Sequence, residues 1–255
     1  MIECGSLEYA QARLNARHGE RLDEADWRRI EGVRSFAPLL ELARSTPLRS
    51  WLVGITPEST EHQVESTLRG HWRATVDEVM GWMPARWQAA VAWCAVLPDL
   101  APLQHLARGH APPPWMSDDS LWRELCHASL HDRRAALDGG PLATLAPAWL
   151  APQTFGEAWL AEWHRRCPHT PAEARDTLGL VVRTLTDHRR DFARAADGQG
   201  WLLRQALRAR LALLLRRATL EPAAAFIHLA LSALDLERLG AELLRRVAFP
   251  RWKVA

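Results

Sequence analysis

Apolar residues recur at helical intervals through almost the whole chain, and this pattern limits the fold more than any other feature. The clearest case is the stretch from residue 59 to about residue 82. Its apolar positions, three or four residues apart, are Val64, Leu68, Trp72, Val76 and Val79. Such intervals place side chains on one face of an α-helix. No segment longer than four residues alternates apolar and polar side chains as a half-buried strand would. The sequence therefore predicts an all-α protein of multiple helices packed in bundles.

The length and composition indicate a protein that folds around a large core. The chain has 255 residues, of which 48% are hydrophobic. Burial of so much apolar surface can stabilise a chain of this length without cross-links. Its four cysteines are too few and too scattered for a disulfide framework. No apolar stretch reaches the roughly 20 residues needed to cross a bilayer. We expect a cytoplasmic protein, with any membrane association peripheral and confined to the inner face of the membrane.

The side chains required by several common catalytic sites are missing. Lys253 is the only lysine, which excludes the lysine of a P-loop, of a Schiff base and of a kinase ATP site. The sequence also lacks the glycine-rich dinucleotide motif, the G-x-S-x-G nucleophile motif, the H-E-x-x-H zinc motif and C-x-x-C. The sequence thus predicts a protein that is not an enzyme, with no catalytic residue and no cofactor.

Three consecutive prolines after Ala111 mark the expected break between helical bundles. Consecutive prolines disfavour helix and hold the chain extended. We predict a linker over residues 111–116, an N-terminal helical bundle over 1–110 and a C-terminal helical bundle over 117–255. The last helix is expected to pack back on the first.

One group of side chains suggests metal chemistry. Its members are Cys126, His127, His131, His164, Cys167 and His169. Thiolate and imidazole ligands suit zinc, and His127 and His131, four residues apart, share a helix face. However, the spacing matches no established zinc signature, and eleven histidines in a helical protein produce such neighbours by chance. We predict no metal site, and a metal- or ligand-binding helical protein that uses this group remains the alternative.

Positive charge is concentrated at the C-terminal end of the chain. The net charge of +2 gives no case for nucleic-acid binding, but residues 201–255 hold ten Arg and Lys against four Asp and Glu. The predicted partner-binding residues are Arg204, Arg208, Arg245 and Arg246. We expect all four to be exposed toward an acidic protein or headgroup surface. Because exposed substitutions change stability little, reversing the charge of Arg204 and Arg208 is expected to leave it nearly unchanged.

The helix expected over about residues 201–218 has no acidic residue. Besides Arg204 and Arg208 it carries Arg210, Arg216 and Arg217. A solvated polar face is one interpretation, since arginines near a helix C-terminus interact favourably with the helix dipole. A surface for an acidic partner or for anionic headgroups is the other.

Three segments carry motifs that occur in this order in one known family. Residues 9–17 read Tyr-Ala-Gln-Ala-Arg-Leu-Asn-Ala-Arg, and residues 83–109 form an apolar helix followed by Asp99-Leu100 and a leucine-rich helix. Residues 234–239, Leu-Asp-Leu-Glu-Arg-Leu, lead into Arg245 and Arg246. Together they resemble the opening helix, the middle helix pair and the last helix of the C/d subunit of V/A-type ATPases.

The resemblance implies a non-enzymatic adaptor or scaffold between the central stalk and the membrane ring. Its implied partners are proteins, namely stalk or ring subunits of a rotary ATPase, and it implies no catalytic residue. Members of that family have three related helical repeats, so the resemblance also implies a fold of repeated helical bundles similar to that of the C/d subunit. This chain is shorter by a substantial part of one of them, and residues 111–200 do not follow the pattern. A stand-alone interaction protein that has lost the rotary role is therefore a further alternative.

Overall fold

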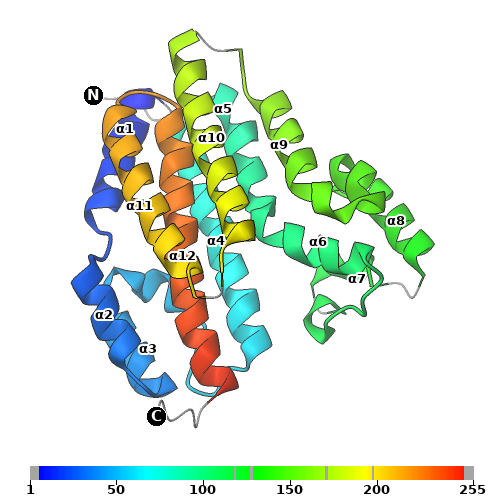
Figure 1. The fold of residues 1–255 in the computed structure, drawn as a ribbon, viewed down its shortest axis with the longest axis horizontal. Helices are drawn as coiled ribbons and strands as arrows, with labels where there is room; N and C mark the ends of the chain where they lie inside the picture. Colours follow the sequence, from blue (N-terminus) through cyan, green and yellow to red (C-terminus); the bar gives the residue numbers. More distant parts are fainter. Residues whose placement is uncertain (1–5, 118, 127–128, 170–171, 197, 250–255) are drawn as a thin grey trace. The chain divides into compact units, whose positions relative to one another are not determined.

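The computed structural model describes residues 6–117, 119–126, 129–169, 172–196 and 198–249 (Figure 1). Within these residues it contains twelve α-helices, five 3-10 helices and no strand. The predicted all-α, multi-helix class is confirmed. The chain divides into two compact units. We call residues 1–91 together with 169–255 the discontinuous unit, and residues 92–168 the inserted unit.

The discontinuous unit contains the long helices of the molecule. In chain order its elements are α1 (Leu7–Gly19), α2 (Glu24–Gly32), α3 (Phe36–Arg44), the 3-10 helix η1 (Pro47–Leu52), α4 (Glu61–Trp82), α5 (Ala85–Ala92), α10 (Ala172–Arg194), α11 (Gly200–Arg217) and α12 (Ala223–Ala248). The last helix, α12, packs against α4, α11, α1 and α10. The expected packing of the last helix on the first is confirmed.

The inserted unit is built from shorter elements. They are η2 (Trp93–Asp99), α6 (Leu100–Ala107), η3 (Pro114–Ser117), α7 (Ser120–Arg123), α8 (Leu130–Gly139), η4 (Ala143–Leu150), η5 (Pro152–Thr154) and α9 (Phe155–Arg166). Trp93 and Trp159 join η2 to α9, because each indole N–H donates to the other residue's carbonyl oxygen, at 3.0 and 3.2 Å.

This division differs from the predicted boundary at residues 111–116. The proline segment lies inside the inserted unit, and it is tied to the unit's core rather than free to act as a spacer. Met116 is fully buried, and Arg133 of α8 donates to the carbonyl oxygen of His110 at 2.8 Å. The chain also returns after residue 168 to pack α10, α11 and α12 with the N-terminal helices. Only these long-range contacts define the units.

Helix α4 shows how local sequence sets an element. Thr60 is the N-cap, because its hydroxyl accepts from the backbone N–H of Gln63 at 3.3 Å while the Gln63 side chain accepts from the N–H of Thr60 at 2.9 Å. This reciprocal pair satisfies two backbone donors at the start of the helix. Ser59 instead accepts from the N–H of Thr56, so the helix begins slightly later than the sequence suggests. All five predicted apolar positions, from Val64 to Val79, are buried.

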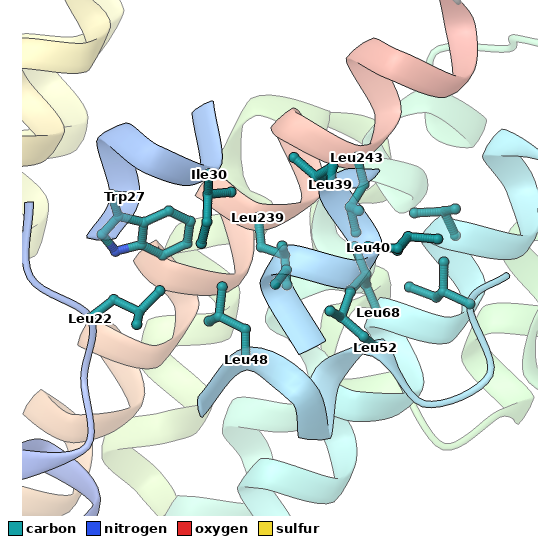
Figure 2. Close-up of a cluster of buried hydrophobic side chains, with 13 residues drawn as sticks. Leu22, Trp27, Ile30, Leu39, Leu40, Leu48, Leu52, Leu68, Leu239 and Leu243 are labelled. Carbon is teal, nitrogen blue, oxygen red and sulfur yellow. The ribbon is translucent and has the colours of Figure 1, made fainter. Parts of the chain in front are cut away.

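The core of the discontinuous unit joins the N-terminal helices to the end of α12. Figure 2 shows Trp27 and Ile30 of α2 near the leucines of α3, with Leu239 and Leu243 of α12 beside them. Gly240 lets α12 approach α4 closely, since a Cβ atom there would lie 3.2 Å from Leu68 Cδ1. Residues from the two ends of the chain therefore share one core.

Removing a side chain from this shared core should show that the stability of the protein depends on it. Leu40 on α3 is 0% exposed. Leu40→Ala is therefore expected to lower the free energy of unfolding by about 2–5 kcal/mol, through lost burial and the cavity left behind.

The control is Leu150 in η4, whose side chain is 75% exposed. Leu150→Ala should change the free energy of unfolding by no more than about 0.5 kcal/mol, since exposed substitutions affect few contacts. Urea denaturation followed by far-ultraviolet circular dichroism measures both variants, and equal losses would contradict the described core.

Candidate functional site

A group of largely buried charges in the discontinuous unit surrounds Asp235 on α12. Its carboxylate accepts from Arg21, which follows α1, and from Arg208 on α11. The exposed fractions of these side chains are 6% for Asp235, 10% for Arg21 and 20% for Arg208. Ion pairs at such low exposure are screened little by salt. The group therefore connects three helical segments at one point.

Further donors of the two arginines bind other groups of the protein, although the buried Nε of Arg21 has no hydrogen-bond partner among the described residues. Arg21 Nη2 donates to Ser232 Oγ at 2.7 Å and to the carbonyl oxygen of His228 at 3.1 Å. Arg208 Nη2 donates to the carbonyl oxygen of Leu22 at 3.0 Å. Because a buried guanidinium is costly without acceptors for its donors, these contacts of the Nη atoms indicate that the charges hold the neighbouring segments together.

His228 is held neutral beside this group. Burial lowers its pKa to about 3, and the positive charge of Arg21 adds to the effect. Its ring centre lies 6.5 Å from that of Trp82 on α4. A neutral imidazole in this position adds no charge to the group around Asp235.

Arg238 attaches the middle of α12 to α2. Its guanidinium donates to Glu24 at 3.0 Å and to Glu31 at 2.7 Å. The same group lies over two indole rings, 4.6 Å from the ring centre of Trp27 and 4.1 Å from that of Trp201. Cation–π contacts of a desolvated arginine add to the ion pairs.

Arg246 binds the backbone where α2 ends. Its Nε donates to the carbonyl oxygen of Val33 at 2.7 Å, and its Nη2 donates to that of Glu31 at 3.0 Å. Its Nη1 bonds Glu242 of its own helix at 2.6 Å. Carbonyl groups in the last turn of a helix lack partners within that helix, and here a side chain from the far end of the chain supplies them.

The four arginines predicted to bind a partner do not form one exposed surface. Arg246 is 4% exposed and Arg208 lies in the Asp235 group, so the expected exposure is wrong for both. Their guanidinium groups donate to acceptors inside the unit. Arg208→Glu would therefore place a second carboxylate against that of Asp235, so the expectation of nearly unchanged stability is also wrong for this residue. Arg204, which bonds Glu237 at 2.9 Å, and Arg245, with a 46% exposed side chain, are more accessible. Partner binding by these two stays a prediction.

The discontinuous unit also has an open cleft of about 400 Å³ between α1, η1, α4 and α12. Arg17 of its lining pairs with Glu20 at 3.1 Å and with Glu78 at 2.6 Å. Arg21 and Asp235, which also line the cleft, pair with each other. The charged side chains that line the cleft thus already have partners within the protein.

The cysteines and histidines proposed as an alternative metal site form no metal-binding group in the part of the chain that the structure describes. Among the residues that the structure describes, no group of three His, Cys, Asp or Glu side chains is placed to hold a metal ion. His127 lies outside the described residues. Burial raises the pKa of Cys167 to about 12, and burial also raises the pKa of Cys94. Both thiols are therefore protonated at neutral pH.

One face of α11 is apolar and exposed, which was not expected from the sequence. Leu202, Ala206, Ala209 and Leu213 are all exposed, and we call these four residues the α11 outer face. The opposite face of the helix is buried and consists of Leu207, Leu211, Leu214 and Leu215. The intervals of four, three and four residues between the exposed positions were a sequence signal that could have identified this face.

Comparison with known proteins adds no assignment. The sequence matches no protein-family model and no curated protein. In the part of the chain that the structure describes, none of the helices has the length and apolar character to cross a membrane. The fold and these groups define a multi-helix all-α protein whose buried charges fix helix positions.

Asp235 is expected to be essential for stability. Asp235→Ala would leave Arg21 and Arg208 facing each other without a carboxylate, and breaking a buried pair in this way costs about 3–5 kcal/mol.

The matched control is Glu237, two residues along the same helix, whose side chain is 49% exposed. Glu237→Ala should cost about 1 kcal/mol or less, because exposed ion pairs contribute little. Guanidinium denaturation compares the two variants. Similar small losses would show that the Asp235 group does not hold the helices.

The depressed pKa of His228 predicts a pH dependence of stability. The folded protein keeps this imidazole neutral down to about pH 3, whereas the unfolded chain protonates it near pH 6.5. Between these values the unfolded state binds the extra proton. The stability from this residue is therefore present above about pH 6.5 and is lost as pH falls, by up to about 1.4 kcal/mol per pH unit.

The test is the difference in unfolding free energy between pH 7 and pH 5. His228→Asn cannot titrate and should show a smaller loss than the wild type, while His62→Asn, at an exposed position of α4, should match the wild type. A His228→Asn protein with the full wild-type pH dependence would rule out this assignment.

Proposed function

We propose that this protein is a non-enzymatic helical adaptor that binds other proteins at or near a membrane complex, as the C/d subunit of V/A-type ATPases does. The observation that supports this most is the pairing of the two ends of the chain. Helix α1 carries the Tyr9–Arg17 motif, and it packs against α12, which carries the 234–239 motif. Two of the three segments behind the resemblance therefore belong to one folded unit.

The bonding inside that unit suits an adaptor. A protein that holds two partners in a fixed geometry must resist sliding of its helices, and apolar packing alone resists it weakly because apolar contacts are not directional. Asp235, Arg238 and Arg246 each bind a segment from the N-terminal part of the chain at low exposure. Hydrogen bonds with ionised groups depend on direction and distance, so they hold α12 in register with α1 and α2.

The proposed partners are proteins, and stalk or ring subunits of a rotary ATPase are the first to test. We propose a cytoplasmic location with peripheral contact at the inner face of the membrane. A stand-alone interaction protein that has lost the rotary role shares this adaptor chemistry. The identity of the bound partners distinguishes the rotary-ATPase adaptor from the stand-alone interaction protein.

Purification from the native cells is the decisive experiment. A tagged wild-type protein, isolated in mild detergent after gentle cross-linking, should carry rotary-ATPase stalk or ring subunits in near-stoichiometric amounts. The Asp235→Ala variant should carry less, because its helices are no longer held in register. Specific recovery of other proteins would support the stand-alone alternative. Isolation of the protein alone under every condition would contradict the adaptor function.

A further inference from the structure

The α11 outer face has the spacing of a helix-pairing seam. Leu202, Ala206, Ala209 and Leu213 follow one another at intervals of four, three and four residues, and Arg216 continues the series. Alternating steps of three and four keep apolar side chains on the line where one α-helix packs against another. From Leu202 to Leu213 the seam is about 16 Å long, at a rise of about 1.5 Å per residue.

The seam is accessible although its residues are apolar. Leu202 is 65% exposed and Leu213 is 53% exposed, while the inner leucines of the same helix are buried against its neighbours. In Figure 1, α11 runs beside α12 with α10 close by, and these are the helices against which it packs. A row of exposed apolar side chains on one face indicates an interaction surface.

Positive charge borders the seam. Arg210 and Arg217 are seven residues apart, at the position next to the seam that determines partner choice in paired helices. Both are exposed, as is Arg216, and none of the three forms an ion pair within the described residues. By contrast, Arg204 and Arg208 of the same helix bind acidic residues of α12. On this helix Arg204 and Arg208 are therefore paired within the protein, whereas Arg210, Arg216 and Arg217 are available to a partner.

These features favour one kind of partner. A second copy of the chain would bring two arginine-rich helices together with no acidic residue on either, which is repulsive. A helix that lies on a membrane needs a wide face of large apolar residues, and this seam is narrow with two alanines at its centre. The alanines allow close approach of another helix, and the arginines require that helix to be acidic.

We propose that the α11 outer face docks an acidic amphipathic helix of a partner protein, with large apolar side chains over Ala206 and Ala209 and carboxylates near Arg210 and Arg217. The proposal rests on the adaptor function above and identifies the surface through which the adaptor would bind a partner. Of the predicted pair on this helix, Arg208 is bound to Asp235, while partner binding by Arg204 stays a separate prediction.

A synthetic peptide tests the chemistry directly. The probe is a labelled helix of about three heptads with leucine in the seam positions and glutamate in the flanking positions, and the comparison peptide has lysine in place of glutamate. Fluorescence anisotropy with the full chain should show binding of the glutamate peptide and none of the lysine peptide. Added salt should weaken the binding.

Two double variants and one control locate the binding. The double variant Leu202→Gln with Leu213→Gln should lower the affinity for the glutamate peptide at least about tenfold. The double variant Arg210→Gln with Arg217→Gln should have the same effect. Leu150→Gln removes an exposed leucine elsewhere and should bind as the wild type does. All substituted side chains are exposed, so circular dichroism should be unchanged.

Several results would overturn the proposal. Equal binding of both peptides would do so, as would unchanged peptide binding by both double variants. A wild-type dimer in sedimentation that Leu202→Gln with Leu213→Gln converts to a monomer would instead show that the face pairs with a second copy. Binding to phosphatidylglycerol vesicles that is lost in this variant, with no binding of either peptide, would show that the face contacts lipid.

The adaptor function is tested separately. If the double variant still purifies with the wild-type partners, the surface is wrong and the adaptor function stands. If the peptide binds but the wild type purifies alone, the adaptor function fails.

Discussion

The position of α12 depends on the carboxylate of Asp235, which faces Arg21 and Arg208 within the discontinuous unit. Arg21 is 214 residues away in sequence, so this contact brings the two ends of the chain together. Asp235 is buried and the two arginines are largely so, and a buried carboxylate would be strongly unfavourable without its partners. Burial of Leu239 and Leu243 stabilises the same junction without selecting a register, whereas the ion pairs require one.

The need for one fixed register of the helices also explains why α12 carries polar residues on its buried side. Arg238 and Arg246, eight residues apart on α12, both reach α2 and bind its acidic side chains and its terminal carbonyl groups. With these donors in use, the charges around α12 are committed to the fold. Function is then expected at the surface, where α11 combines an apolar seam with arginines that the fold does not use.

Much of the secondary structure and little of the site could be predicted from the sequence. The apolar face of α4 is predicted correctly because periodicity is a local property, and its start differs by only one residue because Ser59 and Thr60 can both cap a helix. The surface prediction failed for Arg208 because its acceptor, Asp235, is on another helix. Charge counted along the chain does not show which cations face inward.

The sequence by itself determined the all-α class, the absence of several catalytic motifs and the apolar faces that pack in the core, since each follows from residue identity and spacing. The tertiary structure alone decided the division into units, because residues 169–255 return to the N-terminal helices and leave the proline segment within the inserted unit. It also decided which arginines of α11 are structural and which remain available. Both outcomes depend on contacts between distant residues, and these form only when the helices have packed.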